Sequence, residues 1–213
     1  MRASEPGGSG HATQVTPRLQ TDRLFLRAFR PRDWEAMDAM LSDLTNTRWM
    51  HFSKWTGDNR REWFESCLAN ATRADADALN WAITLRRVEA AIGWFAIDAS
   101  DDGQVGERSF GYLLDQPWWN WGYMTEALEA VLAFEFGTLG TPRIHATCET
   151  ANPASARVHG EGRDASRRDY CDADFEGNWP SVTITRSPGP NMCNSSRAVA
   201  EVQPTADSHD DLA

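Results

Sequence analysis

The stretch that most constrains this chain is residues 117–127, which read Pro-Trp-Trp-Asn-Trp-Gly-Tyr-Met-Thr-Glu-Ala. Residues 109–114 before it have the composition of a short strand. Apolar residues then recur at helical spacing, and Gly137 is the expected end of the helix; they are Met124, Ala127, Leu128, Val131 and Phe134. The pattern predicts a strand, a tight loop with one glycine and a helix N-terminus. Such a junction gathers unpaired backbone N–H groups at the positive end of the helix dipole, which suits a phosphate or pyrophosphate.

The same stretch contains Trp-x-x-Gly-Tyr-x-Thr-Glu-Ala, from Trp119 to Ala127. This motif resembles the acetyl-CoA loop of the GNAT family of N-acetyltransferases. It is most similar to the RimJ/RimL-type branch, which acetylates protein N-termini and small amines. Asn120 stands where that branch usually has glycine, and Asn tolerates left-handed backbone better than most residues. Met124 stands where the family has a small residue, and we expect its side chain to crowd the pyrophosphate.

Two further motifs occur in the order and spacing of the same branch. Residues 21–27, Thr-Asp-Arg-Leu-Phe-Leu-Arg, are similar to its usual beginning. Residues 152–158, Asn-Pro-Ala-Ser-Ala-Arg-Val, match the start of its last helix. The resemblance therefore covers about residues 19 to 158. It implies an α+β fold in α/β/α layers, with a mixed, mostly antiparallel sheet that splays at the acetyl-CoA site.

Local patterns predict the other elements and the domain limits. We expect a strand at 23–29 and a helix at 31–42 that Pro31 and Asp33 open, because both suit a first helical turn. The remaining expected elements are a helix at 60–73, a hairpin of strands at 81–85 and 91–97, and a strand at 143–149. Residues 21–158 are the expected acetyltransferase domain, between tails at 1–20 and 187–213 whose composition predicts disorder.

The pattern of the family stops after Val158, and residues 159–186 form an aberrant segment in which 181–185 read as a lone strand. If the reading frame is moved by one nucleotide, the possible codons for His159 to Asp164 can encode Met-Glu-Lys-Val-Gly-Met, which is the pattern of the family. In that frame the third residue must be Lys or Arg, as the family pattern requires. We infer a frameshift or a sequencing error near Val158, the alternative being a divergent C-terminus. The C-terminal helix and strands are therefore expected to be incomplete, leaving the strand before them with an open edge.

Composition limits the classes of partner. The formal net charge of −10 argues against a nucleic-acid surface, which needs clustered Lys and Arg. The four cysteines lie far apart with no Cys-x-x-Cys, which indicates neither a metal site nor a disulfide framework. No apolar run reaches membrane-spanning length and no signal peptide is evident, so a cytoplasmic protein is expected. The oligomeric state stays open.

The resemblance implies direct transfer of acetyl from acetyl-CoA, the co-substrate, to an amine in a ternary complex. It assigns a thiolate-protonating role to Ser155, and cofactor contacts to the backbone of Leu113 and Leu114, to Asn152, and to the loop residues Trp119, Asn120, Trp121, Gly122, Tyr123, Met124 and Thr125. For Ser155 and Asn152 a helix N-cap is the competing interpretation. The carboxylate that some relatives use as a base is missing near Arg167, and Glu149 and Asp115 are substitutes by proximity alone.

The acceptor is a protein N-terminus or a small amine. Residues 46–59 hold aromatic side chains, among them Trp49, Phe52 and Trp55, that either contact the acceptor or fill the core. Two other function classes remain at this point. One is a catalytically impaired acetyl-CoA-binding remnant, and the other is a scaffold that does not bind CoA.

Overall fold

The computed structural model describes residues 16–50, 55–73, 78–99, 107–149, 151–160, 168–169, 181–185 and 199–200. One mixed sheet runs through the fold in the order β7-β8-β6-β5-β4-β3-β2-β1-β9. Its strands are β1 (Leu19–Gln20), β2 (Leu24–Arg27), β3 (Leu79–Leu85), β4 (Ala91–Ala99), β5 (Glu107–Leu114), β6 (Arg143–Thr147), β7 (Arg168–Asp169), β8 (Ser181–Thr185) and β9 (Val199–Ala200). All neighbouring pairs are antiparallel except β5 and β6, which are parallel.

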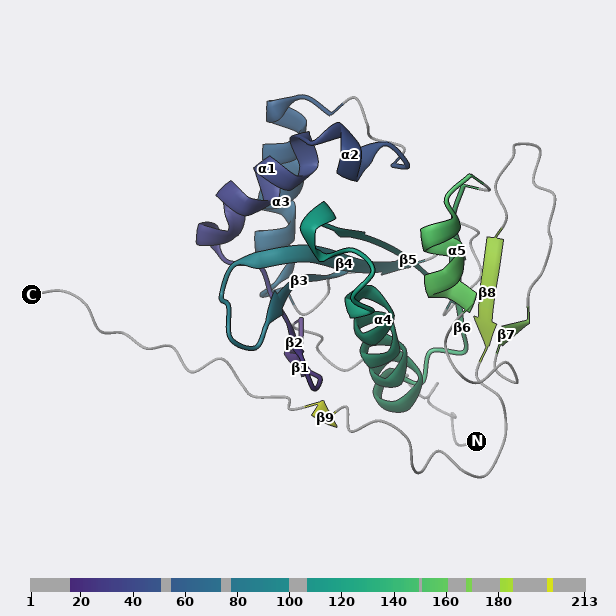
Figure 1. Cartoon of the computed structure of the whole chain (residues 1–213). Helices are drawn as coiled ribbons and strands as arrows, with labels where there is room; N and C mark the ends of the chain where they lie inside the picture. The colour runs from purple at the N-terminus through teal and green to yellow at the C-terminus, as the bar shows by residue number, and fades with distance from the viewer. Residues whose placement is uncertain are drawn as a thin grey trace, which may run out of the picture.

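Helices cover both faces of the sheet, as Figure 1 shows. On one face lie α1 (Trp34–Ser42), α2 (Leu44–Thr47) and α3 (Gly57–Asn70), and on the other lie α4 (Tyr123–Phe134) and α5 (Pro153–Gly160). Alternate strand residues supply two apolar clusters. One joins the α4 face to residues such as Leu24, Leu26 and Phe95, and the other joins α1 and α3 to Ala82 and Trp94. The layered α+β fold expected from the motifs is confirmed.

The sheet opens between β5 and β6. Their pairing covers only Glu107–Ser109 on β5, opposite Arg143–His145 on β6. Beyond this point β5 continues to Leu114 beside β4 alone. The last residues of β6 pair with β8 and not with β5. This divergence is the splay that the resemblance implied, and it lies directly before the loop that leads into α4.

Several element limits differ from the sequence expectations. The α-helix after the loop, α4, ends at Phe134. A π-helical turn, η3 (Glu135–Leu139), follows it directly, and Gly140, with a φ of 72°, is the left-handed C-cap of this turn. Gly140 therefore ends the helix instead of the expected Gly137. The helix expected at 60–73 begins earlier, at Gly57, because Thr56 and Asn59 form a capping box.

The C-terminal expectations need correction. α5 runs from Pro153 to Gly160, where the described part of this segment ends. The strand at 181–185 is not alone, since β8 pairs with all five residues of β6. β6, the strand expected to have an open edge, is therefore covered, because β8 satisfies its ladder hydrogen bonds on that side. The remaining residues of 161–186 lie outside the described part of the chain.

The N-terminal limit also shifts. Leu19 and Gln20 form β1 beside β2, and the side chains of Thr16 and Leu19 are buried. Residues 16–20 therefore belong to the fold rather than to the expected tail, because the alternation of buried side chains extends back to Leu19. Val199 and Ala200 pair with β1, whereas the rest of 187–213 and residues 1–15 lie outside the described residues. Within the described ranges no helix has the length and apolar character to cross a membrane.

Candidate active site

The loop between β5 and α4 has two left-handed residues. Residues 116–118 form a short 3-10 turn, η2 (Gln116–Trp118), and Trp119 follows in extended backbone. Asn120 has a φ of 63° and Gly122 a φ of 75°. Asparagine is one of the few side chains that tolerates this conformation, and glycine adopts it without steric cost. The loop therefore has two left-handed residues within three positions, and α4 begins at Tyr123, directly after the second of them.

The first turn of α4 has no side-chain cap. Gly122 is the N-cap residue and has no side chain to accept a hydrogen bond. The first residue whose N–H bonds back into the helix is Glu126, which donates to the Gly122 carbonyl at 3.1 Å. The backbone N–H groups of Tyr123, Met124 and Thr125 thus point out of the helix end. Together with the helix dipole they are the groups to which the sequence analysis assigned a phosphate, and that role stays a prediction.

The two motifs found separately in the sequence contact each other here. The Glu126 carboxylate accepts hydrogen bonds from the Thr21 hydroxyl and from the backbone N–H of Arg23 at 3.0 Å. The Arg23 Nε also donates to Glu126 at 2.6 Å, and its Nη1 donates to the Trp121 carbonyl at 2.8 Å. Glu126 therefore fixes the turn before β2 to the start of α4.

Met124 does not crowd the loop, contrary to expectation. Its side chain is 5% exposed and packs in the cluster under α4 with Ala127 and Leu128. Met124 already belonged to the apolar stripe that predicted α4. As the second residue of the helix, it lies on the face that turns toward the sheet. Only the backbone N–H of Met124 is available to a ligand.

We expect Met124→Ala to lower the free energy of unfolding by about 2–3 kcal/mol, because it leaves a cavity beneath the first turn of α4. CoA affinity of the folded variant should equal that of the unchanged chain. Urea unfolding and calorimetric titration with CoA test the two statements, with Glu129→Ala, at an exposed position of the same helix, as control. Tighter CoA binding by Met124→Ala would restore the crowding interpretation.

The end of β5 presents one backbone edge to the splay. The Asp115 N–H donates to the Ile92 carbonyl at 2.9 Å, and ladder hydrogen bonds alternate along an antiparallel pair. The backbone groups of Leu113 therefore face β4, while those of Leu114 face the open side. Of the two residues expected to hold pantetheine, only Leu114 has the required orientation. Its carbonyl accepts a hydrogen bond from the Trp119 indole at 2.6 Å, which leaves its N–H.

Ser155 lies against β5 through α5. Its Oγ is 2.8 Å from the Tyr112 hydroxyl and 3.5 Å from Nε2 of His159. The Tyr112 hydroxyl is also 3.1 Å from that Nε2 atom. Burial raises the pKa of Tyr112, so its hydroxyl keeps its proton well above neutral pH. The three side chains form one network of exchangeable protons beside the splay.

Asn152 occupies the N-cap position of α5. Its side-chain oxygen accepts a hydrogen bond from the backbone N–H of Ser155 at 3.1 Å. This is the capping interpretation that the sequence had left open. Asn152 therefore caps α5, and the Ser155 hydroxyl contacts Tyr112.

The model of the acetyltransferase (GNAT) domain family matches residues 23–161, more than half of the chain. This chain belongs to the GNAT acetyltransferase family. The N-acetyltransferase YoaA of Bacillus subtilis is 30% identical over 148 residues, which are 67% of this chain and 79% of that protein. The N-acetyltransferase YnaD of the same organism is 27% identical over 142 residues, 66% of this chain and 78% of that protein.

A solved structure of an acetyltransferase from Agrobacterium tumefaciens has the same fold, with a TM-score of 0.64 at 22% identity over 80% of this chain and 95% of that one. This chain therefore has the same overall fold as that solved acetyltransferase.

Structural contacts account for some of the residues that the sequence suggested as a base or on the acceptor side. The Asp115 carboxylate accepts hydrogen bonds from the Asn46 amide at 2.8 Å and from the backbone N–H of Gln116 at 3.0 Å, so it caps η2. Among the aromatic residues, Trp55 packs on Trp63, which belongs to the α1–α3 side of the core. Trp49 is half-buried with the guanidinium of Arg48 over its ring. Phe52 and Arg167 lie outside the described residues.

Sequence reasoning missed Tyr112 and His159 as site residues. Both were detectable in part, because Ser155 and His159 are four residues apart on one helix face. Tyr112 alternates with Phe110 and Leu114 on one face of β5. No sequence pattern indicates that this face of α5 meets this face of β5, because the contact of Ser155 and His159 with Tyr112 depends on how α5 packs on the sheet. In the part of the chain that the structure describes, no group of His, Cys, Asp and Glu side chains could hold a metal ion.

Proposed function

We propose that this acetyltransferase transfers the acetyl group of acetyl-CoA to a primary amine, a protein N-terminus or a small amine, by direct attack in a ternary complex. The uncapped first turn of α4 beside Gly122 carries the proposal. Three N–H groups aimed at one point fit a pyrophosphate without any basic side chain. The Leu114 N–H on the open side of β5 fits an amide carbonyl of the pantetheine arm, in the manner of an added strand.

The network around Ser155 supplies the proton that the reaction needs. When the amine nitrogen attacks the thioester carbon, the carbon–sulfur bond breaks and the sulfur becomes a thiolate. Ser155 donates its proton to the sulfur and takes one from the Tyr112 hydroxyl across their 2.8 Å hydrogen bond. The attacking nitrogen gives up a proton to water as the amide forms, since no side chain of the described residues is assigned as the base. Tyr112 takes up a proton from that water, so that the buried hydroxyl is not left ionised.

We also assign the chain to the RimJ/RimL-type branch and place a frameshift near Val158. The Thr-Asp-Arg-Leu start and the Trp-x-x-Gly-Tyr loop support the branch. The end of the family match at residue 161, close to the point where the codons regain the family pattern in another frame, supports the shift. The impaired remnant is the less supported alternative, because α5 as written already brings Ser155 to Tyr112.

Release of free CoA thiol from acetyl-CoA, measured across a panel of peptides and small amines, tests the function. We expect release with at least one amine, and Ser155→Ala should slow it about a hundredfold, within the range of general acid–base contributions. A chain with one nucleotide removed near codon 159 should turn over faster than the chain as written. Equal rates would mean that the C-terminus is a genuine ending, and no release by either chain would contradict the enzyme.

A further inference from the structure

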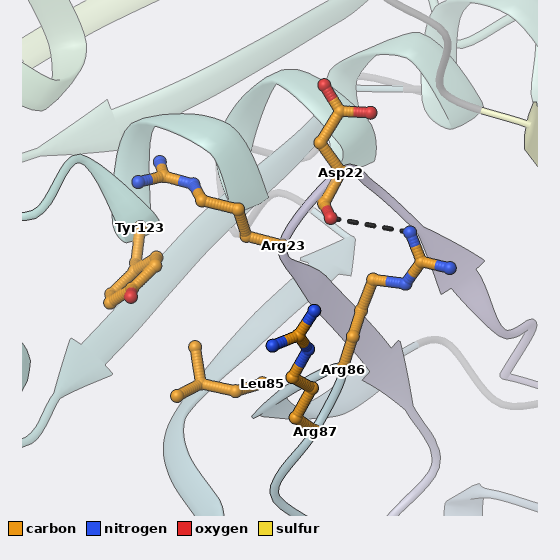
Figure 2. A pocket seen from close by; sticks show the side chains of 6 residues that line it. All are labelled: Asp22, Arg23, Leu85, Arg86, Arg87 and Tyr123. Atoms are coloured by element: carbon orange, nitrogen blue, oxygen red, sulfur yellow. Dashed lines mark hydrogen bonds between the residues drawn. The ribbon is translucent and has the colours of Figure 1, made fainter.

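A pocket of about 580 Å³ adjoins the start of α4 on the side of the β3–β4 turn. Figure 2 shows the residues that line it: Asp22, Arg23, Leu85, Arg86, Arg87 and Tyr123. They come from the turn before β2, from the last residue of β3 and the turn after it, and from the first residue of α4. The pocket therefore lies next to the Gly122 loop. Apart from Tyr123, whose backbone N–H belongs to the first turn of α4, its lining residues are none of those assigned above to CoA or to the acetyl transfer.

Three guanidinium groups and the Asp22 carboxylate line this pocket, and the Arg23 guanidinium is already paired with Glu126. Within the described residues, the Arg86 guanidinium donates one hydrogen bond, a long one of 3.4 Å to the Asp22 carbonyl, and it lies 5.7 Å from the Phe25 ring centre. Arg87 forms no ion pair with any described residue, and none joins Asp22 to these arginines within the described ranges. In a chain of net charge −10, this is a local excess of positive charge that an anion would relieve.

We propose that this arginine pocket binds a phosphate group, held by Arg86, Arg87 and the Nη2 atom of Arg23. Guanidinium groups match phosphate oxygens with paired hydrogen bonds. Leu85 and Tyr123 supply an apolar wall for whatever carries the phosphate, and the Tyr123 ring already stacks under Arg23 at 4.6 Å.

The pocket is coupled to the loop through Arg23. Its Nη1 holds the Trp121 carbonyl, and its Nη2 is 3.5 Å from the position that a Cβ on Gly122 would take. The carbonyl and the following N–H of a peptide plane point in opposite directions. Holding the Trp121 carbonyl outward therefore turns the Gly122 N–H to the opposite side of the loop. A phosphate on Arg23 would reinforce or disturb that hold, so occupancy of the pocket affects the loop.

The phosphate has two possible sources, and its link to CoA rests on the proposed function. It is either the 3′-phosphate of a CoA molecule bound at the loop or the phosphate of a separate small molecule. Calorimetric titration of the full chain with CoA, dephospho-CoA and inorganic pyrophosphate distinguishes them. The titrations are made at fixed low ionic strength, because salt screens exposed charges. The variants are Arg86→Gln/Arg87→Gln and, as a charge-matched control, Arg32→Gln/Arg61→Gln at exposed positions of η1 (Pro31–Asp33) and α3.

If the phosphate is that of CoA, the unchanged chain binds CoA about tenfold more tightly than dephospho-CoA, and the pocket variant removes this difference. If it is separate, CoA and dephospho-CoA bind alike, and pyrophosphate binding weakens about tenfold in the pocket variant alone. Thermal melts confirm that the variants are folded. A pocket variant that binds all three probes like the control overturns the proposal. Pyrophosphate binding that depends on the two arginines without any CoA binding would instead contradict the proposed function and leave the pocket standing.

Discussion

Gly122→Glu is expected to abolish CoA binding. The substitution places a side chain in left-handed backbone, where a Cβ costs about 1–2 kcal/mol. It also adds a carboxylate at the helix end where the proposed pyrophosphate meets the N–H groups of the first turn. Like charges at that point repel, and the side chain fills the approach. Calorimetric titration should show no heat of CoA binding at concentrations that saturate the unchanged chain.

Gly140→Glu is the matched control for this prediction. Gly140 has a φ of 72°, almost the same as the 75° of Gly122, and a Cβ there would meet no atom within 4 Å. It lies at the other end of the same helical segment. Both variants therefore carry similar backbone strain and the same added charge, but only Gly122 adjoins the proposed ligand. Equal loss of CoA affinity in both would show that strain explains the effect, and the loop would no longer be the binding site.

Asp33→Ala is expected to lower the free energy of unfolding by about 3–5 kcal/mol, a large part of the ~5–15 kcal/mol that stabilises a typical domain. Asp33 accepts two hydrogen bonds from the Arg27 guanidinium, at 2.6 and 2.8 Å. The two side chains are 3% and 9% exposed. Removing the carboxylate leaves the guanidinium buried with only the carbonyls of Ala28 and Glu89 as partners.

Two further variants separate the buried charge from loss of packing. Adding Arg27→Met to Asp33→Ala should recover part of the stability, because the uncompensated charge is then gone. Glu65→Ala breaks the exposed pair of Arg61 and Glu65, 50% and 60% exposed, and should cost at most about 0.5 kcal/mol. Urea unfolding compares all three with the unchanged chain. A loss of less than about 1 kcal/mol for Asp33→Ala would mean that water reaches the Arg27 guanidinium, as it does at exposed pairs.

The sequence alone determined the layers of the fold and the place of the candidate site. The apolar stripe from Met124 to Phe134 predicted α4, and the two apolar runs at 81–85 and 91–97, with a turn between them, predicted the β3–β4 hairpin. Both are local patterns that follow from which parts of an element are buried. The left-handed backbone at Gly122 and Asn120 could likewise be predicted, because few other residues adopt it. The family resemblance rested on these same residues.

The tertiary structure decided what depends on contacts between distant segments. Asp33 reads as a residue of a first helical turn, but its carboxylate pairs with Arg27, and Glu126 holds Thr21 and Arg23, 105 and 103 residues away. Met124 fits both a helical stripe and a crowded loop, and only the packing of α4 on the sheet selects the first. The pairing of β8 with β6 and the contact of Ser155 with Tyr112 are equally invisible in the sequence. Local patterns specify which face of an element is buried, whereas the partner across that face is chosen by how the elements pack together.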